Sequence, residues 1–200
     1  IMKTSVIGTE FRNRYLSNPK HPNVFIAKAV VFEGPEDYHK RLNNKKLKID
    51  ENSILIIRGC GPVGYPGSAE VINMQPPDRL LKKGINTLPT LGDGRQSGTS
   101  ASPSILHVSP ESAVGGDLGI VKTGDKIKID LNKRRVDLLI SQSEFKNRRK
   151  KIKKFKINNQ TPWQEIFRDT VGQLEDGACI KSRGVYLKVS TSKGIPRNSH

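Results

Sequence analysis

A serine, an arginine, an acid and a histidine stand in one glycine-rich stretch, "LGDGRQSGTSASPSILHVSP", residues 91–110. A glycine directly follows Ser97, so the backbone that carries its hydroxyl has access to conformations that larger residues avoid. The stretch is not a nucleophile elbow, G-x-S-x-G, because Arg95 and Thr99 stand where glycines are required. The pattern alone leaves two interpretations open, a catalytic loop and an ordinary glycine-serine surface turn. A lone His107 after an apolar stretch is typical of a structural residue.

A second glycine-rich stretch, "GPVGYPG" at residues 61–67, precedes Glu70 at the expected start of a helix. Its carboxylate is a candidate ligand for Mg²⁺, which commonly takes one or two carboxylates and completes its shell with water and substrate oxygens. A first-turn glutamate that the helix dipole favours explains the same residue without a metal. The stretch lacks the Lys-Ser/Thr of a P-loop and the spacing of a dinucleotide fingerprint.

The elements around these loops are predicted to alternate between strands and helices. A strand over 24–33 ends at Gly-Pro, a short helix over 35–44 begins with acids and ends with bases, and the apolar run "ILII" at 54–57 predicts a strand buried on both faces. A helix over 68–84 is interrupted by two prolines and ends at a glycine, and a strand from 85 enters the second loop. Ligands bind where neighbouring strands end in open α/β sheets, so the two loops mark the expected site.

The second half of the chain predicts a hairpin and two helices. Alternating apolar residues at 127–131 and 136–140 flank a tight connection at 132–134, and a helix follows from Ser141 or Ser143 as cap. A last helix begins with Thr161 as N-cap and Pro162 at its first position. Its large apolar residues share one face and are interpreted as packing, on this domain or on a neighbour; they are Trp163, Ile166, Phe167, Val171 and Leu174.

Composition excludes several classes of protein. The longest apolar run is four residues, far below the ~20 that a membrane helix needs, and no signal peptide is recognisable, so we expect a soluble, cytoplasmic protein without a membrane partner. Cys60 and Cys179 are too few for a disulfide framework and are expected to be reduced thiols. Much of the net charge of +16 lies in "KNRRKKIKKFK", residues 146–156. The run is expected to have no acidic residue to pair with at helical i to i+4 spacing, and it holds one aromatic residue. It is therefore interpreted as a solvated helix end and linker, and nucleic acid as an improbable partner.

Six stretches in order resemble the C-terminal domain of the dihydroxy-acid and sugar-acid dehydratase family. They are "IRGCGPVGYPGSAEV" (57–71), "GDGRQSGTS" (92–100), "HVSPESAVGG" (107–116), "GDKIKIDL" (124–131), "PWQEIFRDTVGQLEDGA" (162–178) and "PRNSH" (196–200). The first and fifth look closer to the sugar-acid branch, which acts on aldonates such as arabinonate and xylonate. Ser68 and Gln96 depart from the usual residues and leave the substrate open.

The resemblance implies a hydro-lyase that converts a small 2,3-dihydroxy carboxylate to a 2-keto acid with Mg²⁺ and an iron-sulfur cluster. Ser97 then acts as an alkoxide base toward the C2 proton, Thr99 holds or orients the substrate, and Glu70 is a Mg²⁺ ligand. A serine hydroxyl is a weak base, so a nearby cation and backbone donors are needed to stabilise its anion. Cluster ligands and the other Mg²⁺ ligands are implied to belong to a large N-terminal domain, because neither cysteine here matches a ligand position.

The resemblance also implies a fold and a domain organisation. The expected fold is α/β, a swivelling β/β/α domain with a mixed, β-barrel-like core flanked by helices. Residues 1–22 are expected to form a linker from the missing N-terminal domain, 23–150 the swivelling domain, and 151–200 a basic linker with a C-terminal helix and tail. The chain alone is expected to be inactive, and the full-length enzyme a homo-oligomer. Two alternatives remain: a degenerate basic domain that binds RNA or another polyanion, and a structural cap that supplies no chemistry.

Overall fold

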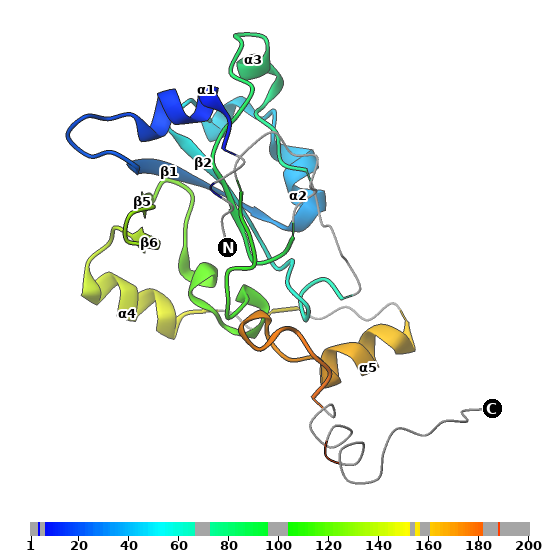
Figure 1. Ribbon diagram of the computed structural model, residues 1–200. Helices are drawn as coiled ribbons and strands as arrows, with labels where there is room; N and C mark the ends of the chain where they lie inside the picture. Colours follow the sequence, from blue (N-terminus) through cyan, green and yellow to red (C-terminus); the bar gives the residue numbers. More distant parts are fainter. Residues whose placement is uncertain are drawn as a thin grey trace.

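The computed structural model describes residues 4, 7–66, 73–95, 104–152, 155–156, 161–181 and 188. Within these residues, six strands form one sheet with the order β4-β3-β2-β1-β5-β6 (Figure 1). The strands are β1 Val24–Glu33, β2 Ser53–Arg58, β3 Thr90–Gly92, β4 Ser104–Ile105, β5 Lys126–Asp130 and β6 Arg135–Leu138. The longer helices are α2 Gly34–Arg41, α4 Gln142–Lys150 and α5 Pro162–Thr170.

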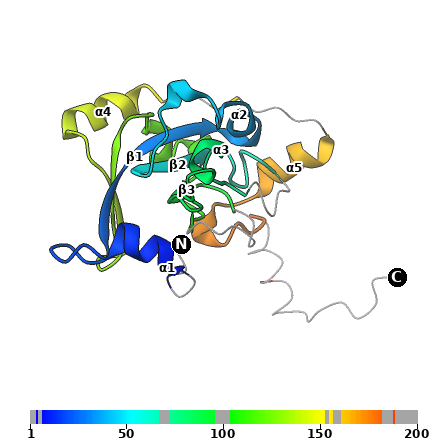
Figure 2. The ribbon, with the colours of Figure 1, turned by 90° about the horizontal axis from the view of Figure 1, so that it is seen from above.

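The sheet is mixed, as the sequence predicts. Strands β1, β2, β3 and β4 are parallel to one another. Strand β5 pairs antiparallel with β1 on its other side and forms a hairpin with β6. The sheet curves into a half-barrel flanked by helices, with α2 and α4 on the same side in the view from above (Figure 2). The α/β class and the swivelling-domain architecture are therefore confirmed.

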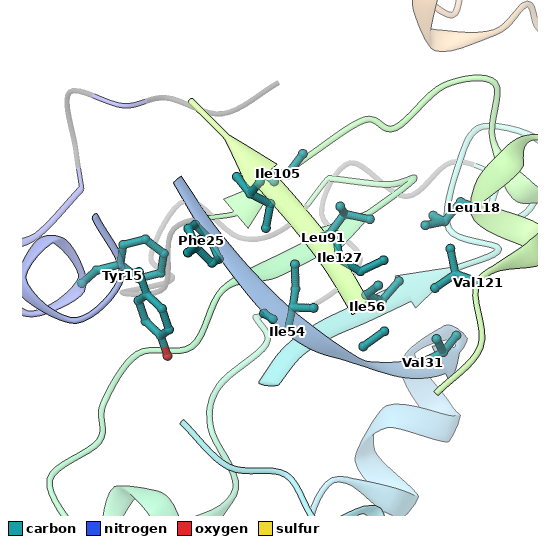
Figure 3. Packing of buried hydrophobic residues seen from close by; sticks show 14 of the residues in the cluster. Tyr15, Phe25, Val31, Ile54, Ile56, Leu91, Ile105, Leu118, Val121 and Ile127 are labelled. Carbon is teal, nitrogen blue, oxygen red and sulfur yellow. The ribbon is translucent and has the colours of Figure 1, made fainter. Parts of the chain in front are cut away.

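Strand β2 lies at the centre of the molecule and is buried on both faces. Ile54 and Ile56 contact one apolar cluster, whereas Leu55 and Ile57 contact a second cluster on the opposite face. All four residues are at most 1% exposed. Figure 3 shows the first cluster, where residues of β1, β2, β3 and β5 meet those of the turn that carries Leu118 and Val121. The continuous apolar run thus has the position that its composition predicts.

Part of the segment expected to be a linker packs on the sheet. The short helix α1, Thr9–Phe11, continues into the π-helical segment Arg12–Leu16. Phe11 and Tyr15 have ring centroids 4.5 Å apart, and both rings contact Phe25 of β1. Burial of aromatic surface of this size contributes several kcal/mol. Residues 9–16 are consequently part of the domain core.

Two of the predicted helices differ in length from expectation. Residues 67–72 lie outside the described part of the chain, and after the two prolines only α3, Asp78–Leu81, is helical. Helix α5 has Thr161 as its N-cap, whose side chain accepts from the Gln164 amide as predicted, but the helix ends at Thr170. Val171 is extended and pairs in an isolated bridge with Ile180.

The basic run at 146–156 is less free of acidic partners than its sequence indicates. Arg148 on α4 bonds to Glu144 one turn earlier at 2.6 Å and to Asp125 at 2.5 Å. Glu144 precedes the run by two residues, so the ion pair between Glu144 and Arg148 is not apparent from the run alone. These partners raise the pKa of the Arg148 guanidinium above its usual range. The expectation that the run has no acid at helical spacing is wrong for Arg148, which fastens α4 to the sheet.

No helix in the described part of the chain is both long and apolar enough to cross a membrane.

Candidate active site

The two glycine-rich loops leave the sheet side by side. Ile57 of β2 pairs with Gly92 of β3 in a parallel register, so Gly59 and Asp93 emerge from the same edge. A cavity of about 400 Å³ lies between the loops. Its walls come from the first loop, from residues 93–95, from His107, and from the segment of α5 and the turn after it; among them are Cys60, Tyr65, Arg95, Phe167 and Leu174. This is the crevice at the carboxyl ends of parallel strands that the sequence predicts.

Asp93 fixes the start of the first loop. Its carboxylate is fully buried and accepts hydrogen bonds from the backbone amides of Gly59 at 3.0 Å and Cys60 at 2.9 Å. It also accepts from the amide of Ser112 at 2.9 Å and from the Ser112 hydroxyl at 2.6 Å. A buried carboxylate with four donors is held by charge-assisted bonds. Asp93 is therefore an internal support of the loop, with both carboxylate oxygens engaged by donors from the chain.

Glu111 fixes the middle of the same loop. Its fully buried carboxylate accepts from the amides of Val63 at 2.9 Å and Gly64 at 2.8 Å, and from the side chain of Gln173 at 2.8 Å. A Cβ atom at Gly61 would lie 2.4 Å from a Glu111 oxygen, so only glycine allows this close approach. The loop is thus positioned by two buried acids that lie far from it in the sequence.

Neither cysteine forms a disulfide in the described structure. Cys60 lines the cavity, and burial together with the nearby Asp93 raises the pKa of its thiol well above the usual range. Cys179 is partly exposed, and its sulfur lies 3.6 Å from the Gly177 carbonyl. That neither cysteine carries the cluster stays an expectation from the resemblance.

His107 and Arg95 are two cavity residues whose position the sequence did not indicate. The His107 backbone has a φ of 55°, in the left-handed region, and its amide donates to the Gly94 carbonyl at 3.3 Å. Burial and the charge of Arg95 contribute to a lowered pKa for the imidazole, so the ring is neutral near pH 7. The histidine interpreted as structural therefore faces the same cavity as the loop that leads to Ser97.

The residues predicted to do the chemistry, Ser97, Thr99 and Glu70, lie outside the described residues. So do Ser68 and Gln96, the two departures from the family pattern. The described chain reaches Arg95 on one side of the Ser97 segment and resumes at Ser104. It reaches Pro66 before the segment with Glu70. Both segments therefore begin close to the cavity, within two to four residues of the predicted site residues.

The described residues do not by themselves form a metal centre. Among them, no three His, Cys, Asp or Glu side chains lie close enough together to hold an ion. Asp93 and Glu111, the two buried acids beside the cavity, are already occupied by backbone donors. A Mg²⁺ ion or an iron-sulfur cluster thus does not fit the described residues alone, and further donors are required.

A larger hollow of about 560 Å³ lies on the other side of Gly59, between α4 and the turn at 117–121. Several cations line it, including Arg58, Arg148, Lys122 and Lys151. Arg58 is engaged by Glu33 and by three backbone carbonyls, and Arg148 by Asp125 and Glu144. Its two arginines thus serve internal contacts, whereas its other cations are Lys122, Lys151 and Lys156.

Comparison with known proteins identifies the family. The family model described as dihydroxy-acid/6-phosphogluconate dehydratase C-terminal matches residues 13–178, which is most of the chain. The chain belongs to this dehydratase family. A D-xylonate dehydratase of Caulobacter vibrioides is 54% identical over 200 residues, which are all of this chain and 33% of that protein. An L-arabinonate dehydratase of Rhizobium leguminosarum is 48% identical over 183 residues, or 90% of this chain and 30% of that protein.

A relative from the dihydroxy-acid branch is less similar than these two. A dihydroxy-acid dehydratase of Thermodesulfovibrio yellowstonii is 38% identical over 154 residues, covering 76% of this chain and 27% of that protein. The resemblance to the dehydratase family and to its sugar-acid branch is therefore confirmed. The chain spans about a third of the length of the curated relatives it matches.

Proposed function

We propose that this chain is the C-terminal part of a sugar-acid dehydratase that converts a 2,3-dihydroxy carboxylate to a 2-keto acid. The observation that carries the proposal is the cavity between the ends of β2 and β3, in a chain 54% identical to a D-xylonate dehydratase. Ser97 follows Arg95 by two residues, and a chain extends by at most ~3.5 Å per residue. Covalent reach thus supports placing the Ser97 hydroxyl at this cavity.

In the proposed reaction, the C2–H bond breaks and its proton passes to the Ser97 alkoxide oxygen. The electron pair forms the C2=C3 double bond while the C3–O bond breaks, and the hydroxyl leaves as water after gaining a proton. The resulting enol gains a proton at C3 as its C2 hydroxyl loses one, which gives the 2-keto acid. The atoms balance as one substrate yielding one keto acid and one water.

The chain's own residues supply charge and orientation for this reaction. Arg95 lines the cavity, and its charge contributes to the lowered pKa of His107. The same positive charge favours an anionic substrate and a serine alkoxide. Thr99, two residues after Ser97, is proposed to hold or orient the substrate. The Asp93 and Glu111 carboxylates hold the first glycine-rich loop in place and have no proposed role in the reaction itself.

Both cofactors are proposed to depend on the remainder of a longer protein. Glu70 is our candidate for one Mg²⁺ ligand, and the other ligands and those of the cluster are assigned to the part that the relatives carry beyond this domain. When bound, these groups would polarise the substrate carboxylate and assist departure of the C3 hydroxyl. The chain alone is accordingly expected to be inactive.

An exposed apolar face on α5 supports a partner from the same polypeptide. Trp163 is 59% exposed, Ile166 is 63% exposed and Ile180 is 41% exposed. Together with Phe167 and Thr170 they line a shallow apolar hollow of about 350 Å³, and α5 lies at the periphery in Figures 1 and 2. Contiguous exposed apolar residues mark interaction sites. Since the relatives are about three times as long, we propose that their additional N-terminal part covers this face.

The proposed function is tested by joining the chain to a matched N-terminal part that carries cluster and Mg²⁺. The assay measures 2-keto acid formed from D-xylonate, L-arabinonate and 2,3-dihydroxy-3-methylbutanoate, for the joined protein and for the chain alone. We expect activity only in the joined protein, highest on an aldonate. Ser97→Ala is expected to lower kcat by about 10²–10⁴-fold, the usual contribution of a general base. Ser143→Ala, on the exposed side of α4, is the matched control and should leave kcat unchanged.

Near-normal turnover by Ser97→Ala with cluster and fold intact would remove Ser97 as the base. It would favour the structural-cap alternative for this chain. Inactivity of the joined protein on every substrate, with the cluster present, would instead favour a degenerate domain, for which RNA binding near physiological salt is the discriminating measurement.

A further inference from the structure

His107 carries two local costs at one residue. Its φ of 55° places a side chain with a Cβ in the left-handed region, which is unfavourable by about 1 kcal/mol or more for residues other than glycine. Its Nδ1 atom is buried and has no hydrogen-bond partner. A buried polar atom without a partner costs about 1–3 kcal/mol. Strained backbone residues cluster at active sites and ligand-binding positions, and an unsatisfied buried nitrogen calls for an explanation such as a functional role.

The position of the residue gives the ligand's location. His107 lines the cavity together with Arg95, Cys60 and Tyr65. The strand-like contacts on either side, from the His107 amide to the Gly94 carbonyl and from the Val108 amide to the Gly92 carbonyl, hold its backbone against the loop after β3. The backbone of His107 is consequently fixed beside residues 92–94, the start of the loop that leads to Ser97. Its backbone cannot relax without breaking these bonds.

The chemistry of the ring gives the ligand's class. A neutral imidazole has one donor and one acceptor nitrogen, and a hydroxyl group both donates and accepts, so it can satisfy Nδ1 in either tautomer. Arg95 adds a positive charge that suits a carboxylate on the same molecule. We propose that His107 is a substrate-positioning residue whose Nδ1 bonds a hydroxyl of the 2,3-dihydroxy carboxylate. This inference rests on the proposed function and adds a residue to its site.

The test uses the joined full-length protein with Ser97→Ala, so that D-xylonate binds without turnover and its Kd can be measured by calorimetry. His107→Gly removes the imidazole and tolerates the left-handed backbone. His107→Asn also tolerates this backbone and keeps a donor and acceptor at the δ position. We expect His107→Gly to weaken D-xylonate binding by about 3–10-fold, the range for one net hydrogen bond, and His107→Asn to recover most of it.

Two comparisons separate positioning from a structural role. Arg134→Gly changes another non-glycine residue with positive φ, 53°, in the exposed turn after β5, and should leave the Kd unchanged. Binding of 2,3-dihydroxy-3-methylbutanoate is measured in parallel with binding of its two monohydroxy analogues, 2-hydroxy-3-methylbutanoate and 3-hydroxy-3-methylbutanoate. The variant should lose affinity for the dihydroxy acid and not for the analogue that lacks the contacting hydroxyl.

Unchanged binding in His107→Gly, or an equal loss for the dihydroxy acid and both analogues, overturns the proposal. Should His107→Gly fail to fold, His107→Asp serves instead, since it tolerates the backbone and presents a negative acceptor, and it should weaken binding more than tenfold. Unaltered binding in that variant also overturns it. Persistent turnover in Ser97→Ala would refute the proposed base alone, because the KM effect of His107→Gly in the parent enzyme can still be read.

Discussion

Replacement of Asp93 by asparagine is expected to loosen the first glycine-rich loop specifically. The carboxylate accepts four hydrogen bonds, from two amides of the loop and from the amide and hydroxyl of Ser112. Asparagine keeps one oxygen and turns its NH₂ group toward a backbone donor, which leaves at least one amide without an acceptor. Bonds to a charged acceptor contribute about 1.5–3 kcal/mol and neutral ones about 0.5–1.5 kcal/mol.

The retained bonds thus weaken and one is lost, while the reduced cost of burying a charge offsets part of the difference. We estimate a net loss of about 3 kcal/mol in the local opening free energy, on the order of 10² in the opening equilibrium. Hydrogen exchange followed by mass spectrometry on peptides that cover 57–66 measures this directly in the joined protein. Asp137→Asn, on β6 with an exposed arginine partner, is the control. Exchange in 57–66 that is no faster in Asp93→Asn than in Asp137→Asn would refute this account of the loop.

Three further predictions concern the described contacts. Arg148→Met should lower the free energy of unfolding by about 3 kcal/mol in urea denaturation, because it leaves the mostly buried Asp125 carboxylate without its cationic partner. Arg149→Met, at an exposed pair, should lower it by less than about 1 kcal/mol. Equal effects of the two variants would contradict the packing of α4. Burial raises the pKa of Tyr15 to about 12, so the contribution of the neutral phenol to folding stability is complete below pH ~10 and is lost as the pH rises toward 12. Tyr15→Phe should therefore flatten the dependence of the unfolding free energy on pH between these values. A pH dependence identical to that of the parent protein would contradict this. The double variant Trp163→Glu with Ile166→Glu should weaken association with a separately expressed N-terminal part at least tenfold, measured by calorimetry. The melting temperature of this chain should stay the same, because both side chains are exposed. Unchanged association would mean that another surface binds the N-terminal part.

Strong local patterns made much of the sheet predictable from the sequence. The apolar run of β2, the alternation in β5 and β6, and the cap of α5 each express a preference that the fold retains. The strand expected from residue 85 forms only over the three residues of β3, and β4 has two residues. Both are too short to carry a period and exist through pairing with β2 and with each other.

The internal supports of the site were not predictable for a different reason. Asp93 and Glu111 each bond to amides more than 30 positions away in the sequence. Nothing in a single sequence distinguishes a buried acid from an exposed one. His107 was visible as a residue type in a polar stretch, but its position beside the cavity depends on the pairing of its backbone with residues 92–94. The predicted roles of Ser97, Thr99 and Glu70 stay predictions, because these residues lie outside the described part.

The contacts between α5 and the first loop imply thermodynamic linkage between two separate surfaces. Arg168 donates to the Val63 carbonyl at 2.8 Å, and Gln173 shares Glu111 with the amides of the same loop. A protein that settles on the outer side of α5 would therefore restrict the inner loop as well. Reciprocity then requires that occupation of the cavity tighten the outer contact by the same factor. Assembly and substrate affinity in such an enzyme would rise together, through a helix that has Trp163 and Ile166 on its outer side and Phe167 in the wall of the cavity.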